Sequence, residues 1–358
     1  MNMIEILKQA VSMGASDIHI VIGLEPMIRV QGVITVLDGF IPINADESQR
    51  MIYSLLTDEQ RVRFEQDWEL DCSFALPQVS RFRLNVFKQR NGTEAVMRII
   101  PAEIPTPQQL GLSPTILSFT DMPRGLVLVT GPSGAGKSTT LACLLNEINH
   151  KRPGNVLTIE DPIEYVYDNN QCIIRQREVD HQTKSFSIAL KHAMRQDPDV
   201  VLIGEMRDLE TISAALTIAE TGQLVFGTLH TSGASQTIDR IIDVFPPHQQ
   251  NQVRAQLSTT LRGVVSQVLL PHSSGRGRIA AREVMVITPG IANMIREGDA
   301  HQIASVIETG SKFGMISMDR SLVNLMQSGD ISLEAAISKA YSVEYIKSEG
   351  RMGPGTGR

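Results

Sequence analysis

Nine residues beginning at position 131 constrain the fold of this chain more than any other part of its sequence. In order, they are Gly131, Pro132, Ser133, Gly134, Ala135, Gly136, Lys137, Ser138 and Thr139. An apolar run at 125–130 precedes them, and a helix-forming segment at 140–145 follows. A strand, a glycine-rich loop and a helix in this order are the signature of a Walker A phosphate-binding loop. The sequence therefore predicts that the chain binds a nucleoside triphosphate.

The residue types of this loop suit phosphate chemistry. Glycines let the backbone bend so that its amides point inward, and the start of the next helix adds partial positive charge. Lys137 is expected to reach the β- and γ-phosphates, and the Ser138 hydroxyl is expected to ligate Mg²⁺. ATP and Mg²⁺ are thus the expected cofactors. A glycine-rich turn with a chance lysine is the alternative, and the flanking strand and helix argue against it.

Length and composition set wider limits. A chain of 358 residues is long enough for two domains. The three cysteines form no Cys-x-x-Cys pair, which fits the reducing cytoplasm. A net charge of -6 gives no general case for nucleic-acid binding. No apolar run approaches the ~20 residues of a membrane helix, so we expect only peripheral membrane contact.

The first 110 residues predict a smaller α+β domain. Periodicity indicates helices at 3–13 and within 46–65, short strands at 16–20, 27–30 and 32–36, and a hairpin at 81–100. Prolines 101, 105 and 107 mark a linker that extends to about residue 118. Asp17 and His19 share one strand face, as half of a metal site or as a solvated polar face.

Arginines gather on the predicted hairpin. Arg81, Arg83 and Asn85 share one strand face, and Arg98 lies on the return strand. Arginines on such a face are either solvated or able to reach a phosphate held by a neighbouring subunit. The residues alone leave both interpretations open.

The second domain, expected at 119–345, alternates strands and helices. Apolar strands at 125–130, 155–159, 200–203 and 224–229 are separated by helices. This pattern indicates a mainly parallel sheet covered on both faces, which binds ligands at the carboxyl ends of its strands. Polar residues follow several of these strands: Glu160, Asp161, Glu205 and His230. From residue 248 the sequence reads as mostly helical, and 346–358 as a disordered tail.

Hydrolysis of a phosphoanhydride needs a positioned water, and Glu205 is the candidate that orients it and accepts its proton. The alternative is a structural ion pair between Glu205 and Arg207. His230 either senses the γ-phosphate or is a buried histidine bound to a backbone carbonyl.

Carboxylates near the strand ends are candidates for metal support. Many ATPases place a metal-binding aspartate at the position of Gly204, so support for Mg²⁺ is expected through water or from Glu160, Asp161 or Glu164. Glu164 is equally compatible with a solvated loop position.

Four segments, 131–139, 158–164, 201–208 and 227–231, resemble the Walker A, Asp, Walker B and His boxes of secretion ATPases. Residues 14–19 and 238–246 resemble the type IV pilus retraction branch, PilT and PilU. The resemblance implies a PAS-like N-terminal domain, a RecA-like P-loop ATPase domain and a homohexamer. Glu205 then matches the catalytic glutamate, and Arg83 and Arg98 match arginines that approach the nucleotide.

The resemblance also implies a cellular role. Members of this branch act in the cytoplasm at the base of the pilus, where they work on an inner-membrane platform protein to disassemble pilin. Pilus retraction and twitching motility are the expected outcome.

Two positions depart from the retraction pattern. Lys191 stands where relatives usually have arginine, and Ala292 replaces the first arginine of a motif associated with retraction. An accessory, PilU-like motor, alone or as a paralogous partner, is therefore an alternative. A motor for pilus assembly or secretion is a second alternative, although such motors commonly have a longer N-terminal region and a four-cysteine insertion that this sequence does not show. A nucleotide-gated interaction module and a nucleic-acid translocase complete the hypotheses.

Overall fold

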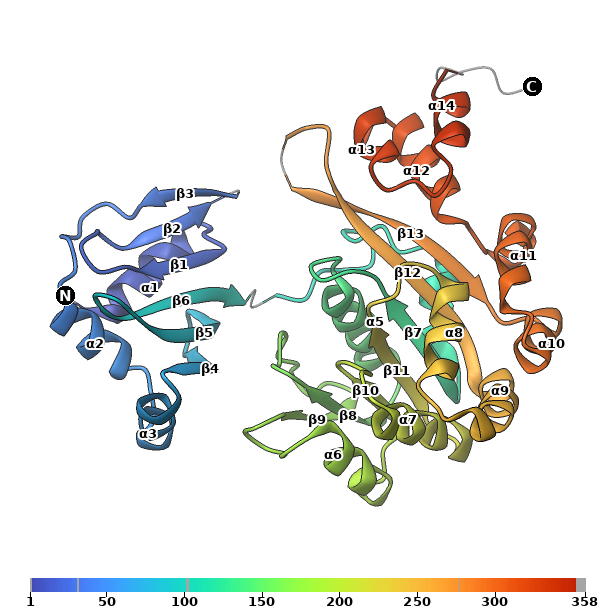
Figure 1. Ribbon diagram of the computed structural model, residues 1–358, viewed down its shortest axis with the longest axis horizontal. Coiled ribbons are helices and arrows are strands. Elements are labelled where there is room, and N and C mark those ends of the chain that lie inside the picture. The colour runs from blue at the N-terminus through green and yellow to red at the C-terminus, as the bar shows by residue number, and fades with distance from the viewer. Residues whose placement is uncertain (1, 31, 101–102, 276, 352–358) are drawn as a thin grey trace. The chain divides into compact units, whose positions relative to one another are not determined.

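The computed structural model describes residues 2–30, 32–100, 103–275 and 277–351. It consists of two compact units, Met1–Glu103 and Ile104–Arg358 (Figure 1). Part of the expected linker, residues 101 and 102, lies outside the described residues, and α4 (Pro114–Ser118) forms near its end. Within the described ranges, no helix combines the length and apolar character needed to cross a membrane.

The first unit is an antiparallel sheet with three helices, so the predicted α+β class is confirmed. Its strands follow the order β3-β2-β1-β6-β5-β4. Their bounds are β1 (Asp17–Ile20), β2 (Met27–Val30), β3 (Val33–Val36), β4 (Glu69–Leu76), β5 (Ser80–Gln89) and β6 (Gly92–Ile100). The helices are α1 (Met3–Ser12), α2 (Ala45–Tyr53) and α3 (Asp58–Asp67).

Apolar and polar side chains alternate along β5 and point to opposite faces of the sheet, as the hairpin pattern predicted. Phe82, Leu84 and Val86 are completely buried in the core of this unit, so Arg81 and Arg83 project from the opposite face. Strand β4, which pairs with β5, was not predicted.

The second unit contains a seven-stranded sheet in the order β13-β12-β7-β11-β10-β8-β9. All neighbouring strands are parallel except β12 and β13, which confirms a mainly parallel α/β sheet. The strands are β7 (Gly125–Thr130), β8 (Gly154–Glu160), β9 (Cys172–Glu178), β10 (Val200–Ile203), β11 (Leu224–Leu229), β12 (Leu261–Pro271) and β13 (Arg278–Val286).

The region after residue 248 differs from the prediction. It was expected to be mostly helical, but β12 and β13 occupy 261–271 and 278–286 and extend the sheet beyond β7. No glycine or proline separates α9 (Pro247–Thr260) from β12, so the sequence gives no sign of the change from helix to strand. Pairing with β7, far away in the chain, stabilises the strand conformation.

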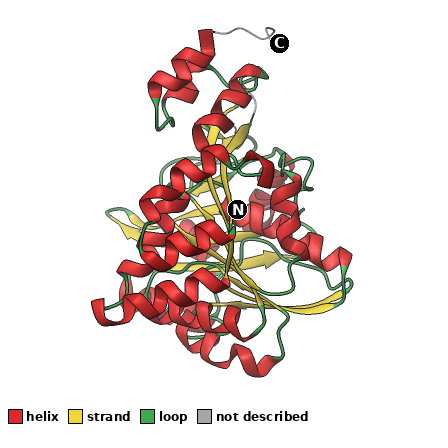
Figure 2. Cartoon of the chain, turned by 90° about the vertical axis from the view of Figure 1, so that its right-hand side faces the viewer, coloured by secondary structure: helices red, strands yellow, loops and turns green. Residues whose placement is uncertain are grey.

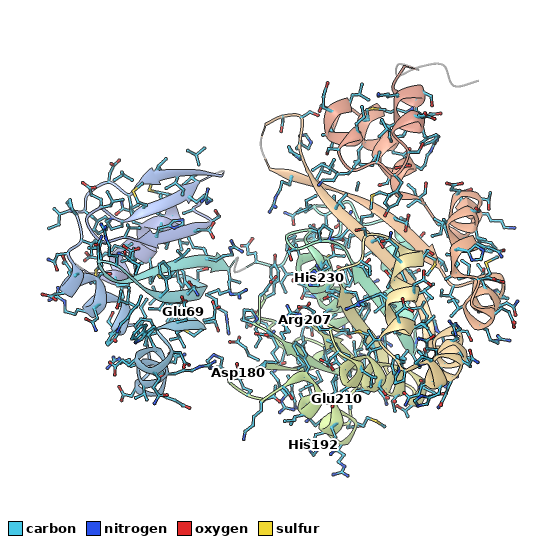
Figure 3. The ribbon with its side chains drawn as sticks, viewed as in Figure 1. Glu69, Asp180, His192, Arg207, Glu210 and His230 are labelled. Carbon is cyan, nitrogen blue, oxygen red and sulfur yellow. The ribbon has the colours of Figure 1, made fainter. Side chains whose placement is uncertain are left out.

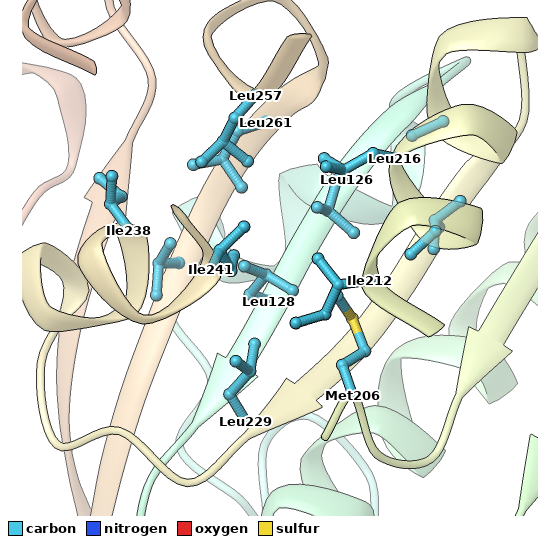
Figure 4. Close-up of a cluster of buried hydrophobic side chains, with 14 of the residues drawn as sticks. Leu126, Leu128, Met206, Ile212, Leu216, Leu229, Ile238, Ile241, Leu257 and Leu261 are labelled. Atoms are coloured by element: carbon cyan, nitrogen blue, oxygen red, sulfur yellow. The ribbon is translucent and has the colours of Figure 1, made fainter. Parts of the chain in front are cut away.

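Helices cover both faces of the sheet (Figure 2). On one face α5 (Lys137–Lys151) packs Leu141 and Leu144 among residues such as Val127 and Val129 of β7. On the other face, Leu126 and Leu128 of β7 pack in a cluster with residues of α7 (Leu209–Thr221), α8 (Ala234–Asp243) and α9 (Figure 4). Helix α6 (Phe186–Ala193) contributes to the same cluster.

The chain ends in further helices: α10 (Pro289–Glu297), α11 (Ile303–Thr309), α12 (Met318–Gln327), α13 (Leu333–Ile337) and α14 (Val343–Arg351). A separate cluster, which includes Leu322, Ala336 and Ile346, holds α12, α13 and α14 together. The first residues of the segment expected to be a disordered tail are therefore helical, and the rest, 352–358, lies outside the described residues.

Candidate nucleotide-binding site

The glycine-rich loop lies at the carboxyl end of β7, and α5 begins at Lys137. Gly131, Gly134 and Gly136 have φ values of 143°, 74° and 83°, a region that side-chain-bearing residues rarely adopt. A Cβ at Gly131 would also clash with the backbone oxygen of Gln267 on β12. The loop conformation and its close approach to β12 thus require glycine.

Lys137 folds back over the loop. Its Nζ donates to the carbonyl oxygens of Gly131, at 2.8 Å, and Pro132, at 3.1 Å. Burial lowers the pKa of Lys137, while the charges of Glu205 and Glu164 act to raise it. The lysine is therefore bound by neutral carbonyls, which leaves its charge able to attract an anion.

The first turn of α5 carries the hydroxyls at 138–140. Ser138 is half-buried there. The Thr139 hydroxyl lies 3.1 Å from the Tyr165 hydroxyl, which links α5 to the segment after β8. Thr140 is buried and donates to Oε1 of Gln267 at 2.9 Å.

Glu205 follows the end of β10 and shares one carboxylate oxygen between two donors. Oε1 accepts from Nε of Arg207 and lies 2.8 Å from Nε2 of His230. Burial alone raises the pKa of Glu205, but hydrogen bonds and charges from Arg207 and His230 outweigh it and lower the pKa. The carboxylate is therefore held ionised at the same edge of the sheet as the loop.

These contacts bear on two of the alternatives. The ion pair between Glu205 and Arg207 is present, as the structural alternative expected, and its presence does not test a catalytic role of Glu205. His230 is not a buried histidine bound to a backbone carbonyl, because its side chain is 44% exposed and its partner is a carboxylate.

Glu160, the last residue of β8, is a buried carboxyl group. Its Oε1 accepts from Thr158 Oγ1 at 2.6 Å and from Gln176 Nε2 at 3.2 Å. Burial raises the pKa of Glu160 to about 7. Asp161 and Glu164, in the segment that follows, are exposed.

The oxygen atoms at this edge fit a magnesium ion bound together with a nucleotide. Mg²⁺ prefers oxygen ligands and usually takes only one or two from the protein in phosphate sites. The hydroxyl of Ser138 and nearby carboxyl groups are of this kind. In the described part of the chain, no group of three or more His, Cys, Asp or Glu side chains is arranged to hold a metal by itself.

Arg83 and Arg98 lie in the first unit, directly opposite each other on β5 and β6. Arg98 Nε donates to Asp17 Oδ1 at 3.0 Å, and Arg29 lies 3.8 Å from the same carboxylate. Arg83 Nε is 3.9 Å from Asp71. Asp17 thus pairs with arginines, which disfavours a metal pair with His19. Asp17 is also buried, at 7% exposure, so the alternative of a solvated polar face is wrong for this residue.

Gln267 was missed by the sequence analysis. It is 1% exposed, and its Nε2 donates to the carbonyl oxygen of Ala135 at 2.6 Å. The available signal was a pair of polar residues, Ser266 and Gln267, within the otherwise apolar stretch 264–270.

Fold and loop together define a P-loop protein of the α/β class, with the loop at the carboxyl edge of a parallel sheet. The chain belongs to the family of type II/IV secretion system proteins, whose model matches residues 2–319.

Individual relatives show which members of this family the chain is similar to. The type IV pilus retraction ATPase PilT of Pseudomonas aeruginosa is 48% identical over 340 residues, which cover 95% of this chain and 98% of PilT. The type IV pilus ATPase PilU of the same organism is 36% identical, covering 96% of this chain and 90% of PilU. A crystal structure of the pilus retraction motor PilT with bound ADP has a TM-score of 0.91 and 44% identity, covering 97% of this chain and 99% of that one.

Proposed function

We propose that this chain is an ATP-hydrolysing motor that powers type IV pilus retraction and twitching motility. The observation that carries the proposal is the juxtaposition of the glycine loop, Lys137 and Glu205 at one edge of the parallel sheet. Identity to PilT exceeds identity to PilU, 48% against 36%, which favours the retraction motor over its accessory relative.

Residues of the loop would hold the nucleotide. Backbone N–H groups within 131–139, a range in which Pro132 has none, would donate to phosphate oxygens. Lys137 would exchange the carbonyls of Gly131 and Pro132 for the β- and γ-phosphates. Ser138 would ligate Mg²⁺, with Glu160 and Asp161 supporting it through water. When bound, the ion neutralises charge on the phosphates.

Glu205 is the proposed general base. Arg207 and His230 hold it ionised, so it is able to accept a proton from water. His230 touches the same carboxylate, and it would sense the γ-phosphate through this shared contact. Glu164, whose charge acts to raise the pKa of Lys137, would be a further carboxylate of the catalytic site.

The proposal extends to an assembly. The chain would form a homohexamer, in which Arg83 and Arg98 reach the nucleotide of a neighbouring subunit. The motor would act in the cytoplasm on the inner-membrane platform protein of the pilus, in peripheral contact with the membrane. A paralogous retraction ATPase is a further proposed partner, in view of Lys191 and Ala292.

Release of phosphate from ATP tests the catalytic proposal. Glu205→Gln keeps the size of the side chain but removes the proton acceptor, so we expect the rate to fall by about 100-fold or more. Glu210→Gln, at an exposed position of α7 (Figure 3), is the control and should keep the wild-type rate. Equal rates in both variants would refute the assignment of Glu205.

Deletion of the gene from a piliated host tests the direction of the motor. A retraction motor disassembles pili, so its loss should leave excess pili that do not retract and cells that do not twitch. Cells without pili would instead show that the chain drives assembly.

A further inference from the structure

Gln267 occupies the position on β12 where its neighbour β7 gives way to the glycine loop. The two strands are parallel, and their register ends with Ser266 opposite Thr130. Gln267 is therefore one residue beyond the last pair, level with the start of the loop. Its side chain is almost completely buried there, at 1% exposure.

Both ends of the Gln267 amide have partners, and these belong to different parts of the site. Nε2 donates to the Ala135 carbonyl at 2.6 Å, and Oε1 accepts from the Thr140 hydroxyl at 2.9 Å. A carbonyl oxygen only accepts, so the NH₂ group must face Ala135. One side chain thus joins the loop to the first turn of α5.

The loop backbone also packs closely against this residue. A Cβ at Gly131 would clash with the Gln267 carbonyl oxygen, and one at Gly136 would lie 3.3 Å from Gln267 Nε2. Gln267 therefore contacts both the start and the end of the loop.

The contact with Ala135 also sets the direction of an amide. A trans peptide carries its C=O and the following N–H on opposite sides. Since the Ala135 carbonyl is held toward Gln267, the N–H of Gly136 must point away from β12. Amides of this loop are the proposed phosphate donors.

We propose that Gln267 is a positioning residue that holds the loop in its phosphate-binding conformation before nucleotide arrives. The inference rests on the proposed function of the loop as a nucleotide site. Without Gln267, part of the binding free energy would be spent on ordering the loop, so nucleotide would bind more weakly.

The test compares two single variants of the full chain that each remove a buried hydrogen bond of β12. Gln267→Met keeps the length of the side chain and removes both amide contacts. Ser266→Ala removes the 2.8 Å contact between the hydroxyls of Ser266 and Thr130, which are both fully buried, and leaves the loop contacts in place. Affinity for MgADP and the KM and kcat for ATP are measured for both variants and for the wild type.

We expect Gln267→Met to bind MgADP about tenfold more weakly, a factor that corresponds to about 1.4 kcal/mol. Its KM for ATP should rise by a similar factor while kcat changes little, because the lost interaction serves ground state and transition state alike. Ser266→Ala should stay within about twofold of wild type, since it leaves both Gln267 contacts intact.

Two results would overturn the inference: wild-type affinity in Gln267→Met, or equal weakening in both variants. If Gln267→Met does not fold, Thr140→Val removes the partner of Gln267 Oε1, and unchanged affinity there would also overturn it. A wild-type chain that fails to bind MgADP refutes the proposed function itself, and this inference with it.

Discussion

Glu283 of β13 is a buried carboxyl group, opposite Ser266 of β12. Its Oε1 accepts a hydrogen bond from the backbone N–H of Ala234, the first residue of α8, at 2.8 Å. Burial raises the pKa of Glu283, and its backbone hydrogen bonds only partly offset this effect. The residue stabilises the start of α8, but its ionised form is costly in this environment.

Replacement of Glu283 should therefore change how stability depends on pH. The pKa of Glu283 is higher in the folded chain than its ordinary value of 4.5. Its contribution to the free energy of unfolding is therefore fully present below pH 4.5, and this contribution declines as pH rises through the folded pKa. A tenfold change in the proton affinity of a group corresponds to about 1.4 kcal/mol. Glu283→Gln, which stays neutral and still accepts from Ala234, should lose less stability than wild type between pH 4.5 and pH 8.

Urea unfolding at both pH values measures this difference. Glu297→Gln, at an exposed position of α10, is the control and should follow wild type. A Glu283→Gln variant whose stability falls as steeply as that of wild type would contradict the assignment.

At the scale of residues, the sequence predicted what local patterns encode. The glycines and Lys137 are adjacent in sequence, and Glu205 follows an apolar strand, so their places at the sheet edge could be expected. The contacts of Gln267 with Ala135 and Thr140 join positions more than 120 residues apart. Only the folded sheet brings them together.

At the scale of elements, buried strands flanked by helices were predictable from their apolar runs, and β7, β10 and β11 are examples. Strands β9, β12 and β13 were missed. Strand β12 pairs with β7, which is distant in the chain, and β13 joins the sheet as the hairpin partner of β12. Strand β9 pairs with β8 at the other end of the sheet. Such pairing leaves little trace in local periodicity.

The packing of β12, a strand that the sequence did not predict, can be tested by a substitution at Gly263. A Cβ at Gly263 would clash with the ring of Phe119, which is completely buried. We expect Gly263→Ala to lower the free energy of unfolding by about 1–3 kcal/mol.

Gly290→Ala in α10 is the matched control, because its added methyl meets no atom closer than 3.8 Å. Alanine favours helix over glycine, so this variant should be as stable as wild type or slightly more so. Denaturant midpoints compare the two variants, and equal stability would contradict the packing of β12 against Phe119.

At the scale of the whole molecule, the resemblance to secretion ATPases of the pilus retraction branch is confirmed by the family match and by the relatives. The match to PilT of Pseudomonas aeruginosa covers 98% of that protein, so the similarity extends over both units. The hexamer, the platform protein and the roles of Arg83 and Arg98 depend on surfaces between chains, and they stay predictions.

The most direct test of the account is a structure of the full chain with Mg²⁺ and a nonhydrolysable ATP analogue. We predict that the triphosphate lies on the loop, that Lys137 Nζ leaves the carbonyls of Gly131 and Pro132 for the β- and γ-phosphates, and that Glu205 faces the terminal phosphoryl group. An empty loop in every subunit, with Lys137 still bound to those carbonyls, would contradict it.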